Sequence, residues 1–216
     1  KESSVVNDRM ETSVPDIYAA GDAVQVKHYV TGNDALISLA GPANKQGRII
    51  ADNICGGDSR YLGSQGSSVI KVFDMTAATT GINETNAKKS GLEVDTVILS
   101  PMSHAGYYPG GKVMTMKVVF EKETYRLLGA QIIGYEGVDK RIDVLATAIH
   151  AGLKATQLKD LDLAYAPPYS SAKDPVNMAG FMIDNIAKGT LKQWHLEDMD
   201  KISRDKSVVL LDVRTV

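Results

Sequence analysis

Alternation of hydrophobic and polar residues is clearest in the middle of the chain, where it predicts a β-hairpin. Val113 to Glu121 and Leu127 to Tyr135 alternate on either side of the polar turn Lys122-Glu123-Thr124. Two strands joined by so short a turn pair in antiparallel fashion. Ser68 to Phe73 and Thr96 to Ser100 are predicted to be further strands of the same unit.

Three segments of this unit have the period of a helix. Asn83 to Ser90 begins with a capping asparagine and ends before Gly91. Asp139 to Ala151 has an apolar face formed by Ile142, Leu145, Ala148 and Ile149. Pro175 to Lys188 is apolar around most of its circumference, so it needs cover on more than one side, which a subunit interface would supply. Strands in one run and helices in another predict an α+β domain with an antiparallel sheet.

The first 60 residues follow a different pattern. The apolar run Ile17-Tyr18-Ala19-Ala20 predicts a strand buried on both faces that ends at Gly21-Asp22. We expect a loop from Val24 to Asp34 and then a helix within Ala35 to Gly57, because Pro42 suits a first turn and two glycines end the segment.

Composition and charge exclude several classes of function. The chain has 216 residues, 44% of them hydrophobic, and a net charge of −2. Its Lys and Arg residues are scattered, so nucleic acid is not an expected partner. No apolar run approaches the ~18 residues of a membrane span. The single cysteine, Cys55, rules out an internal disulfide and indicates a reducing cytoplasm; we expect it to be small, buried and inert. The histidines lack metal-ligand spacing, so no metal site is predicted.

Both ends of the chain have the character of cuts in a longer polypeptide. The chain opens at Lys1 without a methionine, and Val208 to Arg214 has the pattern of a buried strand with nothing after it. The sequence has no Gly-x-Gly-x-x-Gly fingerprint. We therefore expect the dinucleotide-phosphate loops to lie upstream.

Two features of the first segment fit a ligand. The Asp22 carboxylate, next to a glycine that permits close approach, can accept hydrogen bonds from a polyol chain. A helix start at Ala40-Gly41-Pro42 offers free N–H groups and a dipole that stabilise negative charge. Two simpler interpretations stay open: Asp22 caps the next helix, or the helix is an ordinary core helix in which Gly47 permits close packing.

Two loops in the second unit carry more aromatic and polar residues than packing requires. They extend from Ser103 to Gly110 and from Asp162 to Pro175. A phenol with a pKa near ~10 is a neutral donor at pH 7 that can give a departing thiolate a proton. Lys173 as a point charge and His104 as a donor suit a ligand with phosphates. The alternative is amphipathic packing of the tyrosines and a solvated lysine.

The stretch Thr-x-x-Pro-x-Ile-Tyr-Ala-x-Gly-Asp resembles the second flavin-binding motif of the FAD-dependent pyridine nucleotide-disulfide oxidoreductases. The two loops resemble those of the coenzyme A-disulfide reductases, NADH oxidases and polysulfide or persulfide reductases of that family. FAD and NAD(P)H are the cofactors this resemblance implies. The cofactor-binding residues it implies are Thr12, Pro15, Tyr18, Gly21, Asp22, Ala23, Ala40, Gly41, Pro42 and Tyr165.

The same resemblance implies roles for individual side chains. Asp22 holds the ribityl chain of FAD, and the backbone of Ala40 to Pro42 lies beside the flavin ring. His104 and Lys173 contact a coenzyme A substrate. Tyr165 reaches the flavin, and Tyr108 stands near the redox sulfur of the partner subunit, so that these two tyrosines are the predicted catalytic residues.

A division into four parts follows from these motifs. Residues 1–62 are expected to be the α/β end of an FAD-binding domain, and residues 63–189 the α+β dimerisation domain. Residues 190–206 form a polar linker, and residues 207–216 the first strand of a rhodanese-like domain.

The function implied is that of a cytoplasmic homodimeric flavoprotein. It passes electrons from NAD(P)H through FAD and a redox cysteine, expected upstream, to coenzyme A disulfide or a persulfide. One alternative is an NADH oxidase or peroxidase of the same family. The other is that this fragment alone is a non-catalytic dimerisation module.

Overall fold

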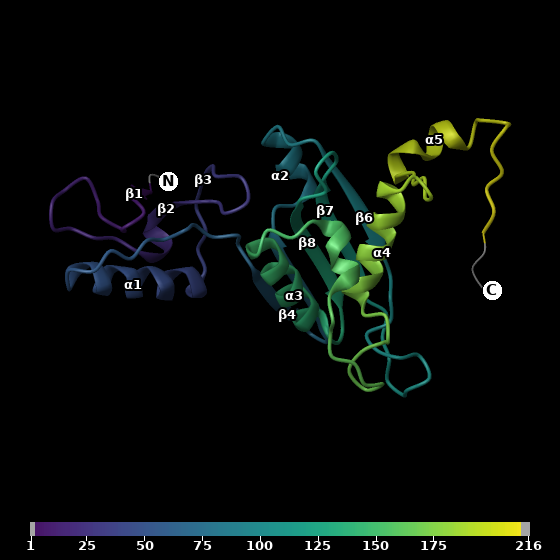
Figure 1. Cartoon of the computed structure of the whole chain (residues 1–216), viewed down its shortest axis with the longest axis horizontal. Coiled ribbons are helices and arrows are strands. Elements are labelled where there is room, and N and C mark those ends of the chain that lie inside the picture. The colour runs from purple at the N-terminus through teal and green to yellow at the C-terminus, as the bar shows by residue number, and fades with distance from the viewer. Residues whose placement is uncertain (1–2, 213–216) are drawn as a thin grey trace.

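The computed structural model describes residues 3–212, which form a small N-terminal unit and a larger unit built on one sheet (Figure 1). In the small unit, β1 (Ser4–Val5) pairs in parallel with β2 (Val24–Lys27), and β2 pairs in antiparallel fashion with β3 (Asp34–Ala35). The short 3-10 helix η1 (Gly21–Ala23) precedes β2. Helix α1 (Ala40–Ile54) covers this sheet, and its Ile49 and Ile50 pack on a small core.

The predicted buried strand at residues 17–20 is wrong. Tyr18 forms a single bridge with Glu11, and 52% of the Ile17 side chain surface is exposed. One bridge is too little for a strand, because no other described segment lies alongside to continue the ladder. The predicted loop from Val24 to Asp34 is also wrong, since β2 and the start of β3 occupy its two ends.

Helix α1 is confirmed, and it starts where Pro42 in the first turn indicated. Leu39, the N-cap, is extended, so the helix begins at Ala40. It ends before Gly56, which has φ +87°, a conformation that glycine adopts without strain. Cys55, the C-cap, is exposed, contrary to the expectation of burial, because it follows the last helical turn and lies outside the packed part of α1.

The larger unit has a five-stranded antiparallel sheet in the order β4-β5-β8-β7-β6. The strands are β4 (Ser68–Val72), β5 (Met75–Gly81), β6 (Val94–Leu99), β7 (Thr115–Glu121) and β8 (Leu127–Gly134). The predicted hairpin is therefore confirmed as β7 and β8. The capped helix is α2 (Glu84–Lys89), in which the Asn83 side chain accepts a hydrogen bond from the Asn86 N–H.

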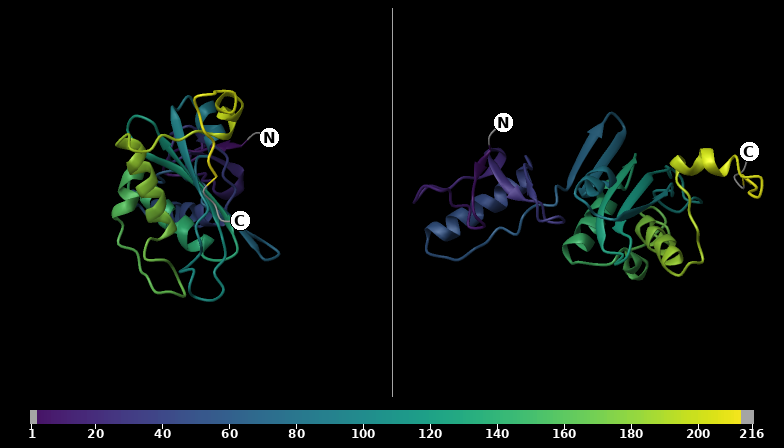
Figure 2. Two further views of the ribbon diagram at one scale, coloured as in Figure 1. Left: turned by 90° about the vertical axis from the view of Figure 1, so that its right-hand side faces the viewer. Right: turned by 90° about the horizontal axis from the view of Figure 1, so that it is seen from above.

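Three helical segments cover one face of the sheet (Figures 1 and 2): α3 (Val138–His150), the 3-10 helix η2 (Ala155–Asp160) and α4 (Pro175–Ala187). Helix α3 buries the four apolar residues that its period predicted. Helix α4 buries Val176, Ala179 and Ile183 completely, so much of the cover expected from a partner comes from its own chain.

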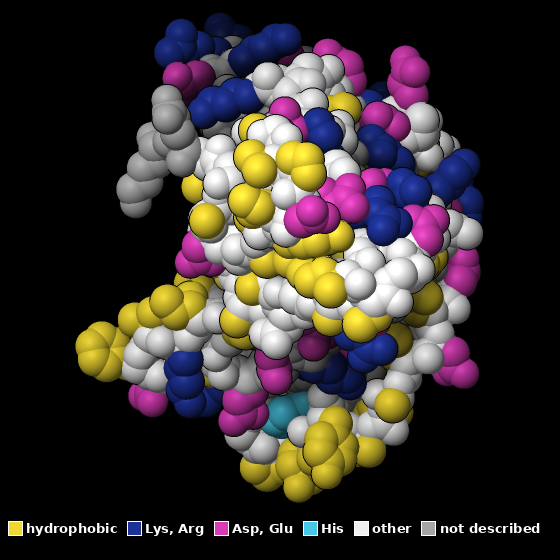
Figure 3. All heavy atoms as spheres, turned by 90° about the vertical axis from the view of Figure 1, so that its left-hand side faces the viewer, with side chains coloured by type: hydrophobic (Ala, Val, Ile, Leu, Met, Phe, Trp, Pro, Cys, Tyr) yellow, Lys and Arg dark blue, Asp and Glu magenta, His cyan; other side chains and the backbone are white. Residues whose placement is uncertain are grey.

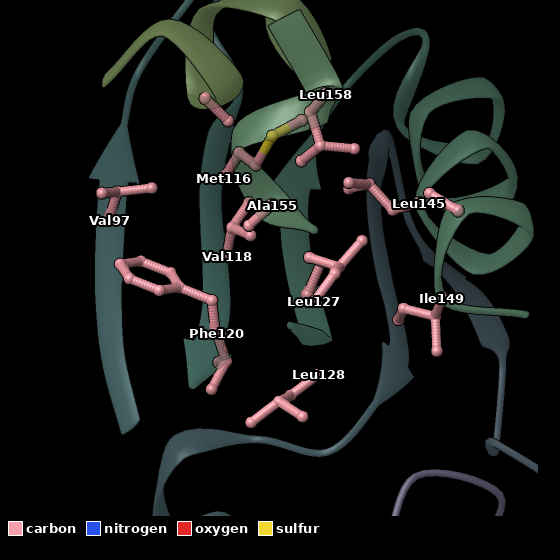
Figure 4. Packing of buried hydrophobic residues seen from close by; sticks show 14 of the residues in the cluster. Val97, Met116, Val118, Phe120, Leu127, Leu128, Leu145, Ile149, Ala155 and Leu158 are labelled. Atoms are coloured by element: carbon pink, nitrogen blue, oxygen red, sulfur yellow. The ribbon is translucent and has the colours of Figure 1, made fainter. Parts of the chain in front are cut away.

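The core lies between this helical layer and the sheet. Figure 4 shows buried side chains of β6, β7 and β8 that form one cluster with those of α3 and η2, among them Val97, Met116, Val118, Phe120, Leu127, Leu128, Leu145, Ile149, Ala155 and Leu158. Strand side chains alternate between faces, so the other half of them lies on the opposite face of the sheet, which is open. A shallow groove of about 410 Å³ on that face is lined by Ile70, Ala77 and Ile133 among others.

The segment after α4 folds back on the edge of the sheet. The Gln193 side chain donates to the Thr96 carbonyl at 3.1 Å, and His195 Nε2 lies 3.1 Å from Asp95. The 3-10 helix η3 (Leu196–Asp198) and helix α5 (Met199–Ile202) interrupt what was predicted as a linker.

The strand predicted at 207–216 does not form within the described residues. Residues 207–212 are not assigned to a strand, and Val209 and Leu211 are exposed. Positions 213–216 of that prediction lie outside the described residues. Among residues 3–212, no helix combines the length and the hydropathy needed to span a bilayer.

Candidate functional site

The two predicted flavin segments meet at the start of α1. The backbone N–H of Gly21 donates to the Gln46 side chain at 2.7 Å, and Gln46 on α1 is almost fully buried. Gly21 has φ +77°, and a side chain there would approach Ala43. The turn that carries Asp22 is therefore fixed against the first turns of α1.

This arrangement presents polar groups to a ligand. Asp22 lies in η1, not at the tip of a strand, and its carboxylate is exposed. The N-cap of α1, Leu39, provides no side-chain cap, so the first N–H groups of the helix, at Ala40 and Gly41, have no capping side chain. An exposed carboxylate beside free helix N–H groups fits the hydroxyls and the electron-rich ring edge of a flavin nucleotide.

The remaining residues of the first motif support this turn. Thr12 Oγ1 bonds to the Val14 backbone just before Pro15, and the Ile17 N–H donates to the Val14 carbonyl at 3.3 Å across Pro15. Tyr18 bridges to Glu11. Ala23 completes η1 before β2 begins. These residues shape the segment that ends at Asp22.

The aromatic loops of the larger unit come together at one end of the sheet, residues 100–114 between β6 and β7 and residues 161–174 between η2 and α4. Figure 3 shows hydrophobic side chains gathered at the lower end of the molecule, where these loops lie in Figure 1. The hydroxyls of Tyr107 and Tyr165 lie 2.8 Å apart, within hydrogen-bonding distance. This hydrogen bond raises the pKa of Tyr165 above the ordinary value of a phenol, which is already protonated at pH 7.

Tyr108 has a different environment from its neighbour. A tight turn, closed by the Tyr108 N–H on the Ala105 carbonyl at 2.9 Å, sends the two adjacent tyrosines in different directions. The Tyr108 ring meets the edge of His104, with ring centroids 5.7 Å apart. The family resemblance singled out Tyr108 and not Tyr107, and two neighbouring tyrosines in a loop carry no periodicity that says which one points to Tyr165.

His104 and Lys173 lie in the same region with different exposure. Only 4% of the His104 surface is exposed, and its Nδ1 lies 3.1 Å from the Ala105 carbonyl. A cleft of about 480 Å³ beside it is lined by Tyr165, Tyr169 and the start of α3. Lys173 is exposed, with its Nζ 6.0 Å from the ring centre of Phe181 on α4.

Sequence reasoning also missed a buried ion pair at the base of the loops. Arg141 of α3 donates to the Asp174 carboxylate at 3.0 and 3.2 Å, and Asp174 caps α4. One signal was available, because position 141 falls on the apolar face of a helix. An arginine at such a position needs a buried acid as partner.

The two groups of predicted site residues do not meet within one chain. Gly41 and Pro42 line a groove of about 1030 Å³ between the two units, opposite His150 and Thr147. None of the residues lining that groove also lines the cleft beside His104. Within residues 3–212, no cluster of three or more His, Cys, Asp or Glu side chains is arranged to hold a metal ion.

Comparison with known proteins shows which family the chain belongs to. Residues 67–175 match the family of the pyridine nucleotide-disulphide oxidoreductase dimerisation domain. The chain is 39% identical over 170 residues to the NAD(P)H sulfur oxidoreductase (CoA-dependent) of Pyrococcus abyssi, which covers 79% of this chain and 38% of that protein. It is 37% identical over 177 residues to the coenzyme A disulfide reductase of Staphylococcus aureus, covering 82% of this chain and 40% of that protein.

A solved structure agrees with the fold. The crystal structure of reduced Bacillus anthracis CoADR-RHD superposes with a TM-score of 0.90 at 49% identity, and the match covers 93% of this chain and 36% of that one. The chain therefore spans less than half the length of the proteins that it resembles.

Proposed function

We propose a function from one premise: the chain belongs to the pyridine nucleotide-disulphide oxidoreductases, whose dimerisation domain occupies residues 67–175. The chain is part of a homodimeric flavoprotein that uses NAD(P)H to reduce coenzyme A disulfide or a related persulfide. The names of its relatives, a CoA-dependent sulfur oxidoreductase and a coenzyme A disulfide reductase, support this substrate class.

The observation that carries the proposal is the hydroxyl pair of Tyr107 and Tyr165. When a cysteine thiolate attacks a disulfide, one sulfur joins the cysteine and the other leaves as a thiolate that must be stabilised and protonated. A phenol whose pKa is raised by its neighbour remains a neutral donor at pH 7. Tyr165, supported by Tyr107, is suited to that donation, and Tyr108 supports the buried His104.

The N-terminal unit would hold FAD. Asp22 would accept hydrogen bonds from the ribityl hydroxyls, and the free N–H groups at the start of α1 would face the pyrimidine edge of the ring. Bound FAD would supply the transfer of electrons from NAD(P)H to the disulfide.

The separation of the two groups of residues supports a homodimer. The loops with Tyr107, Tyr165 and Lys173 share no lining residue with the groove at Gly41 and Pro42. The loops of one subunit would therefore complete the site of the other, with His104 and Lys173 recognising the phosphates of coenzyme A. The upstream redox cysteine belongs to the same proposal.

The domain organisation is part of this proposal. Residues 1–62 belong to the FAD-binding domain, residues 63–189 form the dimerisation domain, and residues 190–206 link it to a rhodanese-like domain that begins at 207. Similarity over 93% of the chain to CoADR-RHD is compatible with this order.

The test is steady-state and stopped-flow kinetics of the full-length protein. Lys173→Ala should raise KM for coenzyme A disulfide about tenfold, because one exposed contact to a phosphate is lost. Flavin reduction by NADH should stay normal, because it precedes contact with the disulfide. If KM is unchanged while oxygen or peroxide is reduced rapidly, an NADH oxidase of the same family replaces this function.

A further inference from the structure

The buried pair of Arg141 and Asp174 has no part in the chemistry proposed above. Only 1% of Arg141 and 2% of Asp174 is exposed, although Arg141 is among the residues that line the cleft beside His104. A buried charge pair is costly to desolvate and needs many compensating hydrogen bonds. The hydrogen-bond partners of Arg141 therefore indicate its role in the structure.

Arg141 joins the two aromatic loops at their bases. Its Nη2 donates to the Ser103 carbonyl at 2.9 Å, in the first loop. The same nitrogen donates to Ser170 Oγ at 3.1 Å and to the Tyr169 carbonyl at 3.4 Å, in the second loop. Its Nη1 donates to the Gly137 carbonyl at 3.1 Å, which ties the guanidinium to the start of its own helix.

Further bonds lock the same junction. Ser170 Oγ donates to Asp174 Oδ2 at 2.7 Å, and the Ala105 N–H donates to the Ser170 carbonyl at 2.9 Å. Tyr107 lies two residues beyond Ala105, and Tyr165 lies five residues before Ser170. The junction thus stands a few residues from both phenols.

Asp174 is not a free base in this arrangement. Its Oδ2 accepts from Arg141 and Ser170, and its Oδ1 accepts from the Val176 N–H at the start of α4. The carboxylate is occupied by these donors and holds the guanidinium in place. A planar guanidinium has five donors in a fixed fork, which a lysine ammonium cannot replace.

We propose that Arg141 is a positioning residue, which through Ser170 and Asp174 holds the two loops so that the hydroxyls of Tyr107 and Tyr165 meet in front of the substrate sulfur. The hydroxyls lie 2.8 Å apart, so a shift of 1 Å that separates them would break their hydrogen bond. The catalytic part of this inference rests on the proposed function; the geometric part does not.

The experiment uses the full-length flavoprotein with 3-fluorotyrosine at position 165, in the wild type and in Arg141→Lys and Ser170→Ala. A pH titration followed by ¹⁹F NMR reports the pKa of Tyr165. In both variants this pKa should fall toward its value in Tyr107→Phe, because the hydroxyl pair separates. The kcat with coenzyme A disulfide should fall about 10-fold in Ser170→Ala and up to about 100-fold in Arg141→Lys, while flavin reduction by NADH is unchanged.

Lys159→Met is the matched control. It removes a different ion pair, in which Lys159 Nζ lies 2.8 Å from Asp184 Oδ1. That pair joins η2 to α4 away from the loops. It should leave both the titration and kcat unchanged. Ser170→Ala alone decides the matter if Arg141→Lys does not fold.

Two results would overturn the inference. One is that Tyr165 titrates in the folded variants as it does in the wild type. The other is that flavin reduction and turnover fall equally in the variants and that Lys159→Met causes the same fall. A wild-type enzyme that does not reduce coenzyme A disulfide would refute the proposed function instead, and the titration would still decide whether Arg141 positions the pair.

Discussion

At the scale of single residues, the site depends on which of two adjacent tyrosines faces Tyr165. The Tyr107 hydroxyl does so, whereas the Tyr108 ring packs against His104. This one-residue difference matters because the Tyr107 hydroxyl, 2.8 Å from the Tyr165 hydroxyl, forms a hydrogen bond with it. The Tyr108 ring, packed on the His104 imidazole, makes no such bond to Tyr165. The tight turn from Ala105 to Tyr108 makes this choice.

We predict that Tyr107→Phe lowers the pKa of Tyr165 toward the usual value of a phenol. The hydrogen bond with the Tyr107 hydroxyl is the largest cause of the raised pKa of Tyr165, so removing that hydroxyl should lower this pKa. ¹⁹F NMR of 3-fluorotyrosine at position 165 measures this shift during a pH titration. Tyr108→Phe is the control and should leave the titration unchanged; a shift in Tyr108→Phe alone would reverse the assignment.

At the scale of elements, close approach of backbones decides where α4 can lie. A Cβ atom built on Gly180 of α4 would lie 2.2 Å from the backbone nitrogen of Lys159 and 2.7 Å from the carbonyl carbon of Leu158. Backbone atoms of η2 cannot move aside as the end of a flexible side chain can. Helix α4 therefore reaches its position only because residue 180 is glycine.

We predict that Gly180→Ala destabilises the protein by about 3 kcal/mol, the upper end of the range for overpacking. Gly47→Ala in α1 is the matched control, because its Cβ meets no atom within 4 Å. There the better helix propensity of alanine should stabilise by ~0.5–1 kcal/mol. Chemical denaturation measures both changes, and equal effects at the two positions would contradict the packing of α4 on η2.

A second prediction at this scale concerns the contact of α2 with the sheet. Ion pairs with Lys117 of β7 and then Lys88 lower the pKa of Glu84 to about 2 from 4.5. A lowered pKa in the folded state stabilises the protein above pH 4.5, and this contribution is lost as the pH falls through 2. With 27% of the side chain exposed, it amounts to about 1–2 kcal/mol.

Glu84→Gln should therefore lower the melting temperature at pH 7, and the difference from the wild type should shrink below pH 4.5 and vanish near pH 2. Thermal unfolding at several pH values measures this. Glu123→Gln, in the exposed turn between β7 and β8, should have little effect at any pH. An equal loss from both substitutions would show that Glu84 does not tie α2 to the sheet.

Prediction from the sequence succeeded for elements that bury one face. The α3 period and the β7–β8 hairpin were confirmed because each signal lies within one element or two elements joined by a short turn. It failed at residues 17–20, because four apolar residues do not reveal whether a partner strand lies alongside. It also could not find the pairing of Arg141 with Asp174, since 33 residues of chain separate them.

At the scale of the whole molecule, two faces of the larger unit are open to a second copy. One is the side of α4, where Phe181 is 42% exposed and lies near Lys173. The other is the uncovered face of the sheet, where Ile133 is 44% exposed. The loops that we propose to act in the partner's site end at α4, so we place the dimer contact on its side.

We predict that Phe181→Asp converts the homodimer that we propose for the full-length protein into monomers, because an unpaired charge in an interface core is strongly unfavourable. Ile133→Asp is matched to it in exposure and should leave the dimer intact. Sedimentation velocity at several protein concentrations distinguishes the two species. Dissociation in Ile133→Asp with an intact Phe181→Asp dimer would move the interface to the open face of the sheet and contradict the dimer contact on the side of α4.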